Sequence, residues 1–410
     1  MAWKNDEGTL GVLVQAFKED RKLRRDGQET FGFNVIGVTQ AAASGDSSLA
    51  GKRMPGSLNS ALFEGTRERQ GGYLAVQVRP TKNLDVHVSA FRADLKADNY
   101  NSSAFALPAG LLNQGWLVKN AVVQGDVIVS ARLERPPETA ANANQRVVGL
   151  QFDHNLREGA ASLSSFYDFD ATLKATDALR LRARAGYTEG RGTTNSQPST
   201  FFGIVNPSMS YNINTSRPTD YTLFDKNGKT IDTGSLANYV QLNNPPAAVD
   251  SSDKEAYVHL DGDYKLNDPF FTSLKFGMRK SNHTRAYNVI SPRWNAQDTA
   301  TGPVTPSPFV AITGGTLVNW TNLPVYPGTV SPTIPNIVPT MPVPVTAYPS
   351  NYASGIDANF PRNFFRFDPA QLQAFANQYV TWNEVEGRNR TAGYEVKEGN
   401  EAVYVMSEFE

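Results

Sequence analysis

The amino-acid sequence predicts an all-β fold, an antiparallel transmembrane β-barrel segment of about eight membrane strands with long extracellular loops. Three observations lead to this prediction. Hairpins recur in which apolar and polar side chains alternate, short turns alternate with long irregular regions, and no run of roughly twenty apolar residues is present to form a membrane-spanning helix. We expect residues 1–410 to form one unit, a partial barrel whose sheet is open at two edges.

The hairpin over 167–187 shows the alternation most clearly. Apolar side chains share one face of both strands and charged side chains share the other, which places Asp170 opposite Arg184. A sheet in a soluble sandwich also alternates, but its apolar face then needs a core. If the apolar face meets lipid instead, Tyr167 and Tyr187 belong to the aromatic girdle at the outer interface, and the turn between the strands is periplasmic.

The charged face of such hairpins is predicted to form the wall of the lumen. The wall residues predicted here and on the hairpin at 254–281 are Asp168, Asp170, Arg180, Arg182, Arg184, His259, Asp261 and Asp263. These charges could form a path for a ligand, or they could pair across strands and satisfy one another within the wall. Cross-strand pairing is the favoured interpretation.

The remaining elements follow the same plan. Alternating strands are predicted at 10–17, 73–79, 84–91, 118–123, 127–133, 256–266, 274–279 and 401–410. Irregular regions are predicted at about 21–65, 98–163, 188–253 and 282–395. Loops this long are uncommon in compact domains, and their alternation with tight turns is typical of an outer-membrane barrel. One short helix is predicted at 368–375, with Asp368 as its N-cap and Pro369 at its first position.

Composition and motifs exclude several classes of function. The net charge of −1 gives no basic footprint for nucleic acid, and the absence of cysteine excludes disulfides, thiolate metal sites and cysteine nucleophiles. The four histidines share no ligand spacing, so no metal site is expected. Neither a phosphate loop nor a Gly-x-Ser-x-Gly elbow is present. We therefore expect no cofactor and no enzyme activity.

Short motifs along the chain point to a family. They are RMPG at 53–56, ALFE at 61–64, RER at 67–69, GG at 71–72 before RPT at 79–81, ADN at 97–99, YTEG at 187–190, YEVKE at 394–398 and AVY at 402–404. Together they resemble the barrel of a TonB-dependent outer-membrane receptor, of the branch associated with carbohydrate uptake. The resemblance covers essentially the whole chain.

This resemblance implies a location in the cell outer membrane, contact with its lipid, and import of a large solute, with an oligosaccharide as the candidate. Such receptors also have a signal peptide, a TonB box, a plug domain and about twenty-two barrel strands. None of these extra parts is visible, so the chain is expected to be an internal piece of a receptor. Coupling to the TonB energy-transducing complex would require a plug and a TonB box supplied by missing sequence.

Aromatic residues in the predicted loops are the candidates for binding the solute. They are Trp116, Trp294, Trp320, Tyr326 and Trp382. Exposed aromatic rings offer apolar faces that can stack on sugar rings, whereas buried ones would pack the loops into a cap over the barrel. Both interpretations remain open. The alternative for the whole chain is a secreted carbohydrate-binding or adhesive β-protein.

Overall fold

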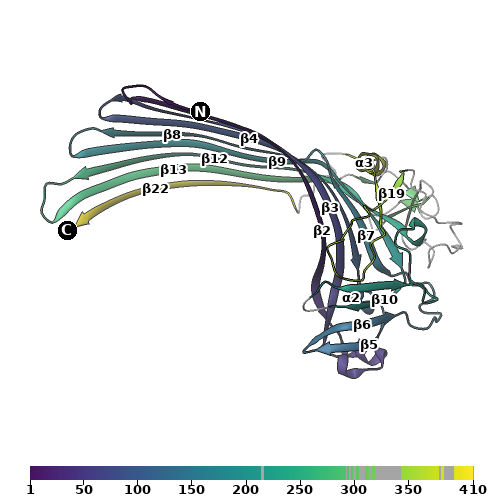
Figure 1. The fold of residues 1–410 in the computed structure, drawn as a ribbon. Coiled ribbons are helices and arrows are strands. Elements are labelled where there is room, and N and C mark those ends of the chain that lie inside the picture. The colour runs from purple at the N-terminus through teal and green to yellow at the C-terminus, as the bar shows by residue number, and fades with distance from the viewer. Residues whose placement is uncertain are drawn as a thin grey trace.

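The computed structural model describes residues 1–213, 217–291, 343–377 and 392–409, with short strand segments between 293 and 319 and at 380–382. In this part of the chain the fold is largely β, and most strands join one large sheet. Figure 1 shows the sheet as a long curved arm that leads into a lobe, where the connections between strands gather. The expectation of a largely β fold is therefore confirmed, and the strands are longer than predicted.

Eight long strands build the arm, and each pairs antiparallel with the next. In order across the sheet they are β2 (Leu10–Val35), β3 (Arg53–Thr81), β4 (Leu84–Ala106), β8 (Ala161–Lys174), β9 (Leu179–Val205), β12 (Val240–Lys265), β13 (Phe271–Ile290) and β22 (Tyr394–Phe409). The short strand β1 (Ala2–Lys4) pairs with the outer side of β2. Among the described residues no strand pairs with the outer side of β22, so the sheet is open there.

Short turns and long connections alternate along the chain, as predicted. The turns lie at the free end of the arm, and the long connections lie at the lobe end (Figure 1). The connections contain α1 (Val38–Ser44), η1 (Ser47–Leu49), α2 (Pro108–Asn113), β5 (Leu117–Gln124), β6 (Val127–Glu134), β7 (Val148–Arg157), β10 (Ser208–Asn212), β11 (Asp220–Phe224), η2 (Leu236–Asn238), β19 (Val345–Ala347), β20 (Phe365–Phe367) and α3 (Pro369–Asn377). Short strands β14 (Arg293–Trp294), β15 (Gln297–Asp298), β16 (Gly302–Pro303), β17 (Val310–Thr313), β18 (Thr316–Asn319) and β21 (Val380–Thr381) complete the set.

Some of the predicted boundaries were wrong, because the strands run on into the lobe. The region at 21–65 was expected to be irregular, yet β2 continues to its end at Val35 and β3 already begins at Arg53. Next to the band, polar side chains occupy both faces of these extensions, and further along β3 the buried Leu58 and Leu62 are interspersed with polar residues, so no strict alternation marks the extensions in the sequence. Their backbones still pair, with Asp20 beside Glu68 for example. The small hairpin of β5 and β6 is confirmed, as is α3, where Gln371 donates its backbone N–H to Asp368 at 2.9 Å.

The buried core lies in the lobe. There the segment 343–377, which we call the covering segment, packs against the lobe ends of the long strands. The sheet contributes Leu58, Leu62, Tyr100, Ala104, Leu150, Phe152 and Phe202, and the covering segment contributes Tyr348, Tyr352, Phe364, Phe365, Phe367, Leu372 and Phe375. No helix in the described part of the chain is long and apolar enough to cross a membrane. The arm has a different character, because its apolar side chains stay exposed.

Candidate functional site: the two faces of the arm

One face of the arm, here called the apolar face, carries a continuous band of hydrophobic side chains. Pairing places Val76, Val88, Phe169, Ala185 and Val258 side by side in one row across five strands. The large members of the band are exposed. They include Val14, Leu74, Val88, Tyr167, Phe169, Leu173, Leu181, Val258, Leu260, Phe276, Met278, Val403 and Val405. Soluble proteins rarely expose apolar patches beyond a few hundred Å², so this band needs a partner.

The lobe-side limit of the apolar band lies nearer the turn end on β22 than on β2. On β2 its outward residues extend from Leu10 to Ala16, and Lys18 follows. The pairing row through Leu10 crosses every strand and ends at Val403 on β22. On the apolar face of β22, going toward the lobe, Val403 is the last apolar residue and the charged Glu401 follows it. The band therefore lies about six residues nearer the turn end on β22 than on β2, a displacement of roughly 20 Å.

This displacement converts into a strand tilt. Seven strand spacings of about 4.8 Å separate β2 from β22, a width of roughly 34 Å. A shift of roughly 20 Å over that width corresponds to strands inclined about 30° to the normal of the band. Membrane barrels hold their strands at roughly 35–45° to the barrel axis. Averaged over the sheet, this inclination is close to the strand tilt of a membrane barrel. The shift comes in two steps, at β3 and at β13, because on β3, β4, β8, β9 and β12 the limit stays in the one row that runs from Leu74 to Ala256.

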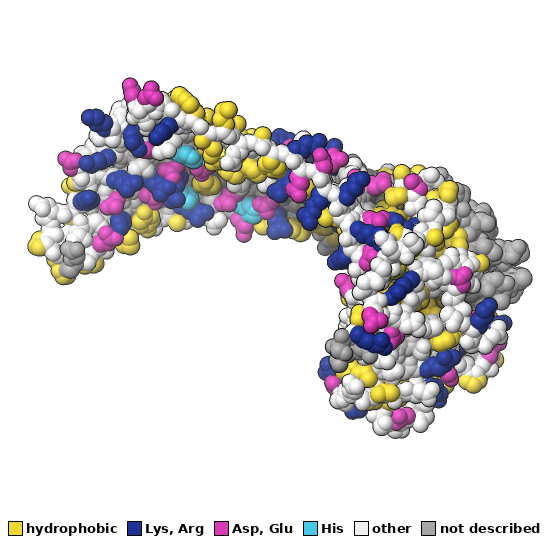
Figure 2. Space-filling model, in the orientation of Figure 1, with side chains coloured by type: hydrophobic (Ala, Val, Ile, Leu, Met, Phe, Trp, Pro, Cys, Tyr) yellow, Lys and Arg dark blue, Asp and Glu magenta, His cyan; other side chains and the backbone are white. Residues whose placement is uncertain are grey.

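The opposite face of the arm, the polar face, carries charged side chains of both signs (Figure 2). Asp170 lies opposite Arg184, as the sequence predicts. The ion pairs run to other neighbours: Arg182 binds Asp170, and Arg184 binds Asp261 on the next strand at 3.2 Å. These contacts favour cross-strand pairing over a row of free charges.

The other predicted wall residues also lie on the polar face. Arg180 lies opposite Asp263 on the adjoining strand. Asp168 accepts a hydrogen bond from the Tyr257 hydroxyl at 2.7 Å, and the His259 ring lies 5.2 Å from the Tyr257 ring. The structure thus brings all eight predicted residues together on one surface that extends over β8, β9 and β12.

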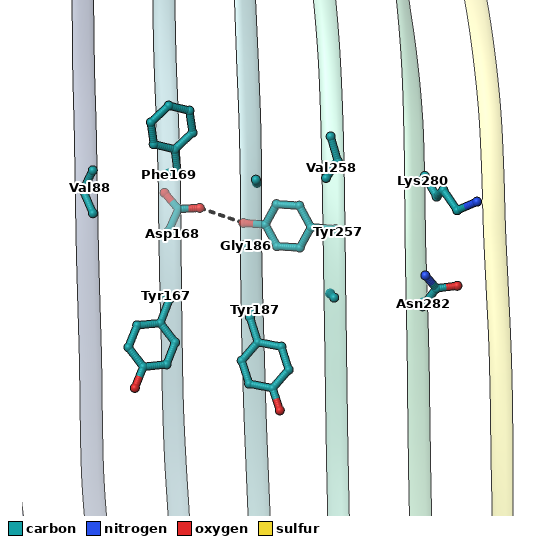
Figure 3. Close-up of a pocket in the computed structure, with 12 residues that line it drawn as sticks. Val88, Tyr167, Asp168, Phe169, Gly186, Tyr187, Tyr257, Val258, Lys280 and Asn282 are labelled. Carbon is teal, nitrogen blue, oxygen red and sulfur yellow. Dashed lines mark hydrogen bonds between the residues drawn. The ribbon is translucent and has the colours of Figure 1, made fainter.

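Two tyrosines on the polar face act as clamps across three strands. Tyr257 of β12 lies over Gly186 of β9 and reaches Asp168 of β8 (Figure 3). Tyr404 of β22 lies over Gly277 of β13 and reaches Asp261 of β12 at 3.0 Å. In both places a side chain larger than hydrogen on the glycine would meet the tyrosine ring at about 2.5 Å or less. These clamps could not be predicted from the sequence, because the pairing of each tyrosine with its glycine depends on which strands are neighbours.

The predicted loop aromatics separate into three groups. Trp116 is 1% exposed and donates its indole N–H to the carbonyl oxygen of Pro207 at 2.8 Å, so it packs the lobe and offers no face to a ligand. Trp382 is 38% exposed and keeps a free surface. The side chain of Trp294 and the whole of Trp320 and Tyr326 lie outside the described residues. The expectation of a stacking surface was therefore wrong for Trp116, because the lobe has a core of its own.

A buried polar cluster in the lobe was also missed from the sequence. The fully buried His154 is hydrogen-bonded through Nδ1 to the Tyr100 hydroxyl, at a distance of 2.7 Å. The same hydroxyl accepts a hydrogen bond from the backbone N–H of Phe367. Burial lowers the pKa of His154 to about 3 and raises that of Tyr100 to about 12. Arg366 stacks over the Tyr100 ring and forms an ion pair with Glu64 at 2.6 Å. The cluster fastens the covering segment to β3, β4 and β7.

Within the described part of the chain, no three His, Asp or Glu side chains come together in a way that could hold a metal ion. Comparisons with protein families, with curated proteins and with solved structures found no match.

Proposed function

We propose that this chain is a transmembrane wall of an outer-membrane barrel of the TonB-dependent receptor type. In this proposal the apolar face meets outer-membrane lipid and the polar face lines the lumen. The turns at the free end of the arm are periplasmic, and the lobe is extracellular. The barrel takes up a large solute, and it needs the TonB complex with a plug and TonB box from sequence outside residues 1–410.

The oblique apolar band is the observation that carries the proposal. A buried core would require only that apolar residues face the same side. A membrane also requires that both edges of the band lie parallel to one plane, the plane of the bilayer, even where the strands are tilted to it. The net shift of the band from β2 to β22 supports the proposal, because tilted strands that cross one plane would give a shift of this direction and size. Each strand of the arm between β2 and β22 pairs with a neighbour on both sides, which is the arrangement that a lipid environment requires.

The receptor family and the solute are proposed from the sequence motifs and from one exposed aromatic side chain. The motifs that resemble TonB-dependent receptors are the basis for the family, and the carbohydrate branch of that family is the basis for an oligosaccharide solute. Among the predicted loop aromatics that the structure describes, Trp382 has an exposed side chain on which a sugar ring could stack. Isothermal titration of the lipid-reconstituted chain with a series of linear and branched oligosaccharides tests the solute. No heat from any sugar would remove the carbohydrate proposal and leave the barrel untouched.

Two neighbouring residues of β3 provide the test of membrane insertion. Val76 points out from the apolar face, and Gln77 points to the polar face, where it bonds Asp85. Val76→Arg places a charge in mid-band and is expected to cost roughly 2–4 kcal/mol of stability in lipid vesicles. Gln77→Arg keeps a long polar side chain on the wall and should behave as the unsubstituted chain.

The measurement is protease resistance and β content after refolding with and without phospholipid vesicles. The proposal expects a protected β structure only with lipid or detergent, weakened by Val76→Arg and not by Gln77→Arg. A chain that is folded and monomeric in water would contradict the barrel. That result would favour the secreted carbohydrate-binding or adhesive protein.

A further inference from the structure

A groove lies on the apolar face at the lobe end of the band (Figure 3). The volume of this open groove is about 520 Å³. Its floor is made by the short side chains Ala185 and Ala256, and its apolar walls are Val88, Tyr167, Phe169, Tyr187 and Val258. Lys280 and Asn282 of β13 form its polar side, where Lys280 is paired with Glu401 of β22. The hollow exists because alanines on two adjacent strands stand between large neighbours.

A second hollow of about 750 Å³ continues the groove toward the turn end. It begins at Ala171, Ala183 and Leu260, each two residues beyond a lining residue of the first groove on the same strand. Together the hollows follow β9 from Tyr187 to Leu181, a length of roughly 20 Å. At a tilt of about 30° that is roughly 17 Å of depth, close to half of a hydrocarbon core about 30 Å thick. The combined groove thus matches one leaflet of a bilayer.

The lobe end of the groove is polar. The Tyr167 and Tyr187 rings lie side by side with both hydroxyls directed toward the lobe (Figure 3). Neither hydroxyl has a hydrogen-bond partner among the described residues. The next row on the same face contains Arg92, Glu189 and Lys254. Two free O–H donors therefore lie between an apolar groove and a charged row.

We propose that this groove is a seat for one lipid molecule of the outer leaflet. Its acyl chain follows the alanine floor, and the ester or phosphate oxygens of its head accept hydrogen bonds from the two tyrosine hydroxyls. The seat rests on the proposed function, because only insertion in a membrane brings lipid to this face. On the other side of the sheet the Tyr257 clamp holds β8, β9 and β12 together beneath the floor, so the groove is present before the lipid arrives.

The test counts lipids retained by the full chain. The chain is reconstituted in vesicles of phosphatidylethanolamine and phosphatidylglycerol, extracted into mild detergent, and analysed by native mass spectrometry. Ala185→Leu fills the floor and should lower the fraction of chains with a bound lipid roughly tenfold, since an acyl chain is excluded from the groove. Ala16→Leu, on the apolar face of β2 outside the groove, is the matched control and should retain lipid like the unsubstituted chain.

The double variant Tyr167→Phe/Tyr187→Phe keeps the shape of the groove and removes only the donors. It should retain less lipid than the unsubstituted chain but more than Ala185→Leu. Equal retention by the unsubstituted chain and by both groove variants, all inserted and protease-resistant in vesicles, would overturn the seat and leave the barrel standing. Failure of the unsubstituted chain to insert would overturn the proposed function and the seat together.

Discussion

Replacement of Gly186 by alanine tests the clamp formed by Tyr257. A Cβ on Gly186 would lie 2.4 Å from Cζ of Tyr257 and 2.5 Å from its hydroxyl oxygen. The ring must therefore move, and its hydrogen bond to Asp168 at 2.7 Å must break. Gly190, four residues further along the same strand, is the matched control, because its nearest neighbour to a new Cβ is Asp253 at 4.0 Å.

The expected magnitude follows from three contributions. A hydrogen bond to a charged group that is only partly buried is worth about 1.5 kcal/mol. Displacing a packed ring costs about 1–3 kcal/mol, and alanine gains about 0.5–1 kcal/mol over glycine in a strand. Gly186→Ala should thus lower the free energy of unfolding by about 1.5–4 kcal/mol, whereas Gly190→Ala should leave it unchanged or raise it by up to about 1 kcal/mol.

Urea unfolding in vesicles or detergent, followed by far-UV circular dichroism, measures both variants. Tyr257→Phe provides a third point, because it removes the hydrogen bond and keeps the ring over Gly186. It should cost less than Gly186→Ala. If Gly186→Ala is no more destabilising than Gly190→Ala, the tyrosine is not held over the glycine and the clamp is refuted.

Three further predictions concern the lobe. Burial raises the pKa of Asp153 to about 6, so the folded lobe holds a proton that the unfolded chain releases near pH 4; its stabilising contribution should be complete below about pH 4 and vanish as the pH rises through 6. Denaturation curves between pH 4 and 7 should lose this slope in Asp153→Asn, and an unchanged slope would contradict the assignment. His154, with its pKa lowered to about 3, should act in the opposite sense, so that its contribution is present above about pH 6.5 and is lost toward pH 3; His154→Phe should make the lobe less sensitive to acid, as measured by the same titration. Trp116→Ala should destabilise the lobe by about 3–5 kcal/mol through a cavity, and Trp116→Phe by clearly less; equal stability of Trp116→Ala and the unsubstituted chain would show that this side chain is not part of the core.

Local alternation and a tight turn were sufficient to predict the register of the central hairpin. A strand slipped by one residue would turn every apolar side chain to the polar face, so only one pairing of Asp170 with Arg184 fits. The ion pairs could not be predicted in the same way. Arg184 binds Asp261, and the pairing of β9 with β12 follows a connection that leaves no periodic signal.

The burial of the lobe aromatics could not be predicted from the sequence for a related reason. Trp116 meets Pro207, and Tyr100 meets Phe367, across long separations in the chain. In the arm, a residue's face follows from its own strand, whereas in the lobe it depends on which distant segment covers it. The strand extensions beyond the band were missed for two reasons. Next to the band, residues such as Asp20 and Glu68 are polar on both faces, and further along β3 the apolar Leu58 and Leu62 face a core that the distant covering segment completes.

The central claim is that the apolar face meets lipid and the polar face meets water. The chain contains no cysteine, so single cysteines can be placed at each position of 179–187 on β9 and labelled with a nitroxide. In vesicles, odd positions should be accessible to oxygen dissolved in the lipid, and even positions to a water-soluble nickel reagent, with the two accessibilities alternating strictly. Water accessibility at the odd positions, or exclusion of both probes from them, would contradict the account.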